Sequence, residues 1–179
     1  MQHDLQPTIA LLTRTPATLD ALLRGLPEAW TECNEGANTW TPSEIIAHLI
    51  HGELTDWIPR ARWIWQFGDT RPFEPFNRAA HLEESQRKPL PQLLDEFAHA
   101  RAESLAQLRA LNLQPPDLDR RGQHPALGAV TMSQLLCTWA VHDLTHLHQI
   151  SRVMAHQYRN DVGPWSAYLG VLSCDGHSK

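Results

Sequence analysis

The sequence predicts an all-α protein that folds as a four-helix bundle with a long crossover connection and a short C-terminal helix. Apolar residues recur at intervals of three and four residues over four long segments, and no convincing strand pattern interrupts them. Helices with one apolar face bury that face against one another, and four such helices make a bundle. Because 179 residues are enough for one ordinary core, we expect a single domain over residues 1–179.

The first predicted helix covers residues 5–24, where leucines recur with helical spacing. Pro16 lies inside this segment, and a proline within a helix removes a backbone hydrogen bond. We therefore expect Pro16 to kink the helix or to delay its regular part. Glycine, proline and asparagine then mark residues 25–38 as a loop.

The second predicted helix has the clearest start signal in the chain. Thr41 can cap it, Pro42 occupies the first helical position, and Glu44 completes a capping box. Pro59 is expected to bend this helix, because a proline ring clashes with the carbonyl of the preceding turn. Residues 60–67 then add about two further turns.

A long connection separates the second helix from the third. Residues 68–91 contain four prolines and many charges, and the segment is longer than the usual loop of a bundle. We interpret it as the crossover connection rather than as a strand region. The third helix follows over residues 92–111, and residues 112–130 form another loop rich in turn residues.

The fourth predicted helix begins at a second capping box. Thr131 and Gln134 have the required spacing, and the helical pattern continues to about Tyr158. A short final helix over residues 164–172 is expected to pack across one end of the bundle. These elements complete the predicted architecture.

Composition and charge restrict the classes of function. The formal net charge of −5 argues against nucleic acid as a partner, because phosphate binding needs a concentrated basic face. No apolar run approaches the ~20 residues that span a bilayer, and the first residues lack the features of a signal peptide. We therefore expect a cytoplasmic protein that binds neither nucleic acid nor membrane. Cys33, Cys137 and Cys174 are too scattered for a disulfide framework, and Cys137 is expected to be a buried thiol.

The eleven histidines include two at a helical spacing in the fourth helix. His142 and His146 are four residues apart, so they lie on one face of the helix. They interrupt an apolar stripe and so occupy core positions. A metal bound by one nitrogen of each ring, with the other nitrogen bonded to an acceptor, would satisfy both imidazoles. The alternative is a pair of core histidines bonded to backbone or to neighbours such as Glu53 and Asp56.

The second helix supplies a third candidate ligand. His48 lies one turn after Glu44, at the edge of the apolar face, and Gly52 is expected to leave an open patch beside it. His51 is the rival candidate, on the more polar side. The alternative for His48 is an ordinary solvated or capped side chain, as is usual for a lone histidine at a helix edge. Together with the pair in the fourth helix, His48 would complete a three-histidine set. Such sets bind catalytic zinc and keep a coordination position open.

The remaining histidines carry no comparable signal. His99 lies between Glu96 and Glu103 and is expected on a solvated face, whereas His148 faces away from His146. The others lie in loops or at element ends without ligand spacing: His3, His81, His124, His156 and His177. No nucleophile elbow, P-loop or dinucleotide motif is present.

Three segments resemble the DinB/YfiT-like superfamily of bacterial metal-binding four-helix bundles: WTPSEIIAHL at 40–49, GAVTMSQLL at 128–136 and HDLTHLHQI at 142–150. In that superfamily one metal ligand comes from the second helix and two come from an HxxxH motif on a later helix. The resemblance follows the helix order of the whole chain and implies His48, His142 and His146 as the ligands. It implies a divalent transition metal, Zn or Ni first, with Fe or Mn as alternatives. We also expect a homodimer.

Characterised members of this superfamily include thiol-dependent S-transferases and a mycothiol-dependent isomerase. Three neutral imidazoles leave the full positive charge on a metal, which lowers the pKa of a bound thiol or water. The resemblance therefore implies transfer of a low-molecular-weight thiol to an electrophile. Hydrolysis by metal-bound hydroxide is the alternative, with Glu44, Glu53 or Asp56 as a candidate base. A metal-holding stress protein without turnover is a third interpretation.

Overall fold

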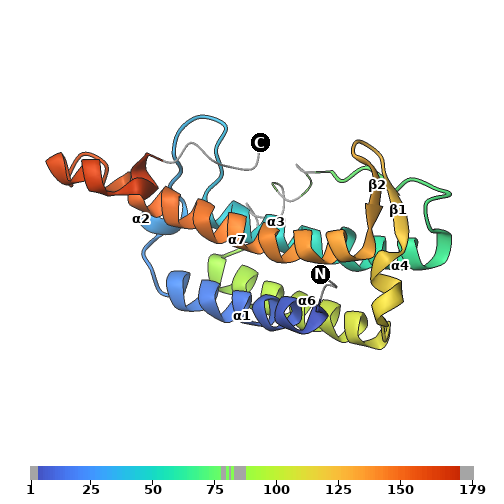
Figure 1. The fold of residues 1–179 in the computed structure, drawn as a ribbon. Coiled ribbons are helices and arrows are strands. Elements are labelled where there is room, and N and C mark those ends of the chain that lie inside the picture. The colour runs from blue at the N-terminus through green and yellow to red at the C-terminus, as the bar shows by residue number, and fades with distance from the viewer. Residues whose placement is uncertain (1–3, 78–79, 81, 83–87, 174–179) are drawn as a thin grey trace.

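Four long helices form the body of the protein, which we describe from a computed structural model (Figure 1). They are α1 (Leu5–Leu23), α3 (Pro42–Thr55), α6 (Leu90–Ala110) and α7 (Met132–Gln157). Helix α3 packs against α6 and α7, and α1 also packs against α6 and α7. The four-helix bundle predicted from the sequence is therefore confirmed. The structure describes residues 4–77, 80, 82 and 88–173.

The start signals of the two helices that carry the candidate ligands are confirmed. At the start of α3, the Thr41 amide donates to Glu44 Oε2 at 2.8 Å and Thr41 Oγ1 accepts from the Glu44 amide at 3.2 Å. At the start of α7, Thr131 and Gln134 exchange the same two bonds at 2.8 Å and 3.2 Å. Each capping box satisfies amides that the first turn of a helix leaves without a partner. The two helices therefore begin where the sequence predicts.

The break in the second predicted helix lies earlier than expected. Helix α3 ends at Thr55, and α4 (Trp57–Phe67) begins after Asp56, whose φ of −113° and ψ of −69° depart from regular helix. Pro59 has no amide hydrogen for the Thr55 carbonyl, and its ring crowds that carbonyl. The distortion therefore falls in the turn that precedes the proline. Pro16, by contrast, lies within α1 without dividing it into separate helices.

A β-hairpin replaces part of the loop predicted between the third and fourth helices. Strand β1 (Arg121–His124) pairs antiparallel with β2 (Gly128–Thr131), within the segment expected to be a loop. Gly122 faces Ile64 and Phe73 so closely that a Cβ at this position would stand 2.6 Å from Ile64 Cγ1. Strands of four residues are too short to show an alternating pattern, and this pair is held against α4 by contacts distant in sequence.

The connections contain short helical turns as well. Helix α2 (Glu28–Thr31) and the 3-10 helix η1 (Pro115–Asp119) lie in segments expected to be loops. The final predicted helix is two 3-10 helices, η2 (Gly163–Tyr168) and η3 (Gly170–Leu172), which contain no buried residue. They extend beyond the end of α7 (Figure 1), and so η2 does not form the packed α-helix expected there.

The core consists of two apolar clusters along the bundle. One contains Trp57 and Trp139 and lies towards α4 and the hairpin, whereas the other contains Phe97 and Ile150. The guanidinium of Arg101 lies 5.0 Å from the Phe97 ring and 5.2 Å from the Trp139 ring, and so joins the two clusters. Within the described part of the chain, no helix is long and apolar enough to cross a membrane.

Candidate metal centre

The structure brings the three predicted histidines together at one place on the bundle. His48 comes from the middle of α3, and His142 and His146 lie one turn apart on α7. His142 Nε2 is 3.2 Å from His48 Nε2 and 3.1 Å from His146 Nε2. Among the residues described, these three form a group whose ligand atoms lie within 4.8 Å of one another.

These distances suit a shared tetrahedral ion. Two imidazole nitrogens on one zinc at 2.0–2.1 Å would stand roughly 3.3 Å apart, close to the two separations observed. His48 and His146 are buried, and His142 is partly buried. An all-nitrogen set of this kind suits Zn, Ni, Cu or Fe. The three histidines can therefore hold a transition metal, while ligation itself stays a prediction.

A glutamine one turn away orients His146. The two atoms His146 Nδ1 and Gln149 Oε1 lie 2.8 Å apart, so Nδ1 donates and the lone pair of Nε2 is directed at the candidate centre. Burial lowers the pKa of His146, although the bond to Gln149 and the charge of Asp143 oppose this effect. The ring is therefore neutral at neutral pH, as a metal ligand must be.

Aromatic side chains surround the three imidazoles. The ring of Trp40 lies 4.8 Å from that of His48, and the ring of Phe76 lies 5.8 Å from it. On the other side, the Trp57 ring meets His142 edge-on at 5.1 Å. Apolar walls restrict water and strengthen electrostatic interactions at the centre.

The centre lies in a pocket of about 470 Å³ between the bundle and the hairpin. Helices α3, α4 and α7, residues 73–76 and the hairpin turn all contribute to its walls. The lining is mostly apolar or aromatic and includes Phe73, Val130 and Leu135, and its polar side chains include Asp56, Arg60 and His124. Apolar walls with a few placed polar groups are typical of small-molecule sites.

Two expectations about the surroundings of His48 are resolved by the structure. The space beside Gly52 is filled, because Trp57 Nε1 lies 3.2 Å from where a Cβ of residue 52 would stand. The open patch expected there is therefore wrong, and the open space lies on the pocket side of the histidines. His51, the rival candidate, contacts Thr55 through Nε2 at 3.4 Å and is not part of the group.

None of the three candidate bases is a free carboxylate at the centre. Glu44 belongs to the capping box of α3, and Glu53 accepts from Arg101 and from Trp139 Nε1. Asp56 does line the pocket, where its Oδ1 lies 2.6 Å from Arg60 Nε. Burial raises the pKa of Asp56, and the charge of Arg60 opposes that increase.

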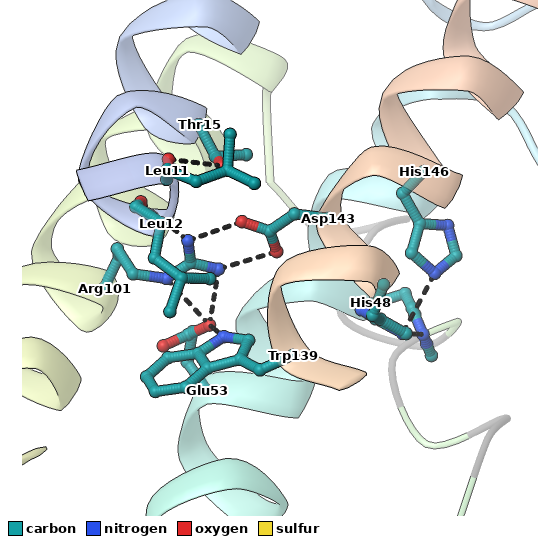
Figure 2. Close-up of polar contacts among 10 residues, drawn as sticks. Leu11, Leu12, Thr15, His48, Glu53, Arg101, Trp139, Asp143 and His146 are labelled. Carbon is teal, nitrogen blue, oxygen red and sulfur yellow. Dashed lines mark hydrogen bonds and ion pairs between the residues drawn. The ribbon is translucent and has the colours of Figure 1, made fainter. Parts of the chain in front are cut away.

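Behind the candidate centre, Arg101 holds a buried ionic cluster (Figure 2). Its two Nη atoms bind the two oxygens of Asp143 at 2.6 Å and 2.8 Å. Nε and Nη2 bind Glu53 Oε1 at 3.0 Å and 2.8 Å, and Nη1 also donates to the Leu12 carbonyl at 2.8 Å. Each of the five N–H donors of the guanidinium thus has an acceptor. The cluster connects all four long helices.

The cluster and the histidines use neighbouring positions on the inner side of α7, and their side chains point in different directions. Figure 2 shows Asp143 directed towards Arg101 and His146 directed towards His48. Burial lowers the pKa of Arg101, but the hydrogen bonds and negative charges of Asp143 and Glu53 raise it by more. The pKa of Arg101 is therefore raised overall. The guanidinium therefore stays charged in the core and fixes the position of α3 relative to α7.

This cluster was not predicted from the sequence, and neither was the place of Arg60 and His124 in the pocket. A signal was present, because Arg101 interrupts the apolar stripe of α6 between Phe97 and Leu105. Asp143 similarly lies between Trp139 and His146 on the inner side of α7. Charged residues at core positions of two helices predict a buried ion pair, because a buried charge needs a partner.

The other candidate residues behave in different ways. His99 is exposed, as expected, with Nε2 3.3 Å from Glu103 Oε1, and His148, expected to face away from His146, is exposed as well. His124 was expected not to be a metal ligand, and it lines the pocket outside the histidine group. Cys33 and Cys137 are half-buried, so Cys137 is less buried than expected. Four further residues lie outside the described part of the chain: His3, His81, His177 and Cys174.

Comparison with solved structures finds the same fold elsewhere. YfiT from Bacillus subtilis superposes with a TM-score of 0.74 at 18% identity, over 86% of this chain and 87% of YfiT. TT2238, a four-helix bundle protein, superposes with a TM-score of 0.51 at 21% identity, over 83% of this chain and 98% of TT2238. No curated protein sequence matches the chain. The family model of the DinB superfamily matches residues 11–150. This chain, with its three converging histidines, therefore belongs to the DinB superfamily.

Proposed function

We propose that this protein is a metal-dependent enzyme that transfers a low-molecular-weight thiol to an electrophile. His48, His142 and His146 would hold a divalent transition metal, with Zn or Ni as the first candidates. The observation that carries the proposal is the convergence of three imidazole Nε2 atoms, 3.1–3.2 Å apart along the group, in an apolar pocket. The resemblance to a superfamily with thiol transferases supports the choice of reaction.

The chain's own side chains support this chemistry in three ways. Gln149 holds His146 in the tautomer that presents Nε2. Trp40, Trp57 and Phe76 keep water from the reacting atoms, which protects a thiolate from protonation. When bound, the metal supplies a Lewis acid that lowers the pKa of the thiol.

The transfer balances without any redox partner. A carbon–sulfur bond forms as the bond from that carbon to its leaving group breaks, and the leaving group departs with the electron pair of the broken bond. The thiol proton and the leaving group are released together as the conjugate acid. No cysteine of the protein is required, and neither Cys33 nor Cys137 lines the pocket.

Metal-dependent hydrolysis is the second candidate. YfiT is described as a probable metal-dependent hydrolase, and Asp56 of this chain lines the same pocket as the histidines. A hydrolase of this kind uses a base or orienting group near the attacking water. We rank it second because Asp56 already pairs with Arg60, while Glu44 and Glu53 are bonded elsewhere. A metal-binding protein without turnover is the third candidate.

One assay on metal-loaded protein separates the three candidates. Thiol consumption would be measured with a reactive electrophile across several thiols, in parallel with ester and amide hydrolysis without thiol. Turnover that needs both thiol and metal, and that His142→Ala abolishes while His51→Ala retains it, supports the transferase. Metal-dependent turnover only in the thiol-free wells overturns it in favour of hydrolysis. Silence in every well favours the metal-binding protein.

A further inference from the structure

A second group of polar side chains lines the pocket beyond the candidate metal centre. It consists of Asp56, Arg60 and His124, and the pocket lining also includes Gln134 and Thr138. Asp56 follows His48 by eight residues, which corresponds to ~12 Å along a helix. A small molecule could therefore contact both groups at once in a pocket of about 470 Å³.

Arg60 is held in place by two contacts within this group. Its Nε lies 2.6 Å from Asp56 Oδ1, and its guanidinium lies over the Phe73 ring at 5.2 Å. The side chain is 13% exposed. Within the described residues the ion pair with Asp56 is the one polar contact of this side chain, so the Nη edge of the fork is available to a ligand. That edge matches a carboxylate in geometry and charge.

His124 adds a donor at the same end of the pocket. Its Nδ1 accepts from the amides of Ala126 and Leu127, both at 3.1 Å, so the ring proton of the neutral form is on Nε2. Its ring meets Phe73 edge-on at 6.2 Å, and so it lies on the same phenyl ring as Arg60. Burial and the nearby charge of Arg60 lower the pKa of His124, which keeps it neutral and its Nε2–H a donor.

We propose that Arg60 and His124 form a subsite that binds a carboxylate of the substrate, with Asp56 positioning the guanidinium. The same pocket is lined mostly by apolar side chains, including Trp57, Phe73 and Leu135. The substrate class is therefore a small molecule with a reacting end at the metal centre, an apolar middle and a carboxylate at the far end. This inference rests on the proposed function in one respect, which is that the end of the substrate at the metal centre is the end that reacts.

The test uses Co²⁺-loaded protein, because a thiolate that binds Co²⁺ produces a charge-transfer absorption band. The probes are straight-chain ω-mercaptocarboxylates of increasing length and the matching ω-mercaptoamides. In the wild type, at the best chain length, the carboxylate should bind about tenfold more tightly than its amide, as expected for hydrogen bonds to a charged group. Binding should also be tightest at an intermediate chain length, because the histidines and the subsite of Arg60 and His124 lie in different parts of the pocket.

Four variants assign the effect to the subsite. Arg60→Gln and the double variant Asp56→Asn/Arg60→Gln should make carboxylate and amide bind equally, and the double variant leaves no buried Asp56 charge without its partner. His124→Asn retains an acceptor near the Nδ1 position, removes the Nε2 donor, and should reduce the preference in part. Arg62→Gln, an exposed arginine on the same helix, should retain the wild-type preference. Circular dichroism checks that each variant is folded.

The outcomes separate this inference from the proposed function. If mercaptans bind Co²⁺ but carboxylates and amides bind equally in the wild type, the subsite is overturned and thiol binding stands. If no mercaptan gives the band, calorimetry with alkanoates and alkanamides decides the subsite alone. A preference for alkanoates that Arg60→Gln removes then upholds the subsite while the thiol chemistry fails. Equal binding there overturns the subsite as well.

Discussion

The imidazole of His142 lies between those of His48 and His146 and shares close Nε2 contacts with both. Neutral imidazoles held in this way have lone pairs directed at a common point, unless one of them carries a proton there. Three imidazole nitrogens that are shielded from water favour a transition-metal cation as their common partner, because imidazole is a good ligand for such ions.

Removing the central imidazole should abolish metal binding without unfolding the protein. We expect His142→Ala to lower the metal content from one ion per chain to near zero, because two imidazoles alone leave the ion poorly held. The helical circular dichroism should change little, since His142 is partly exposed and the core is apolar. Elemental analysis of protein purified without a histidine tag measures the change. The matched control is His51→Ala, which should retain the metal.

The metal-free protein should lose stability in mild acid. Burial lowers the pKa of His146 from its ordinary 6.5, so in the pH range just below 6.5 the unfolded chain binds more protons than the folded chain. The free energy of unfolding should therefore fall as the pH falls through this range. Thermal melts of metal-free protein at a series of pH values measure it. His146→Gln should flatten the dependence, whereas His99→Gln, an exposed control, should not.

At the scale of elements, a single arginine sets how the ligand-bearing helices are placed. Arg101 on α6 binds Glu53 on α3 and Asp143 on α7. Glu53 lies five residues after His48, and Asp143 follows His142 directly. The arginine therefore fixes the register of α3 against α7, on which the distance between His48 and His142 depends.

Replacing Arg101 by methionine should destabilise the protein by about 3–5 kcal/mol, because two carboxylates remain buried without their cation. Burial already raises the pKa of Glu53, and the charge of Arg101 opposes that increase. Denaturant unfolding followed by circular dichroism measures the loss. Arg109→Met, at an exposed position of the same helix, is the control and should change stability little. Equal effects from the two variants would contradict the role given to the cluster.

The hairpin is the second element that shapes the site, and its position depends on Gly122. A Cβ there would lie 2.6 Å from Ile64 Cγ1 and 3.0 Å from Phe73 Cζ, both in the apolar core. Gly122→Ala should therefore cost about 1–3 kcal/mol of stability, as overpacking does. Unfolding by denaturant measures it. Gly170→Ala, which has open space around its Cβ position, is the control and should be neutral.

At the scale of the whole molecule, the fold does not depend on the metal centre for its core. Two apolar clusters run along the bundle, and the three histidines stand on the pocket side of α3 and α7. A structural metal site, in contrast, supplies the folding energy of a small domain. The bundle is expected to fold with or without an ion.

Chelation should reduce the free energy of unfolding only by the binding free energy of the ion, and so lower the melting temperature. The helical content at room temperature should stay unchanged. Mass action predicts the shift, because an ion that binds only the folded state stabilises it in proportion to the logarithm of its free concentration. Circular dichroism melts with and without chelator measure it. Collapse of the helical signal on chelation at room temperature would show that the metal is structural.

The sequence by itself determined the four helices, the starts of α3 and α7, and the pair His142 and His146, whereas His48 was added by the resemblance to the superfamily. These features are local, because capping boxes and apolar spacing act over a few residues and His142 and His146 share one helix face. The hairpin, the break at Asp56 and the cluster around Arg101 were not predicted. The cluster joins residues up to 89 positions apart, as between Arg101 and Leu12.

Only the tertiary structure decided which side of each histidine is open and which carboxylates remain available. Trp57 fills the space beside Gly52, and Arg101 and Arg60 take up Glu53 and Asp56. Spacing along a helix gives the face on which a side chain lies, but it does not give the partner that packs against that face. That partner is chosen when α6, α4 and the hairpin come together, because burial of a charge or a ring depends on every element that surrounds it.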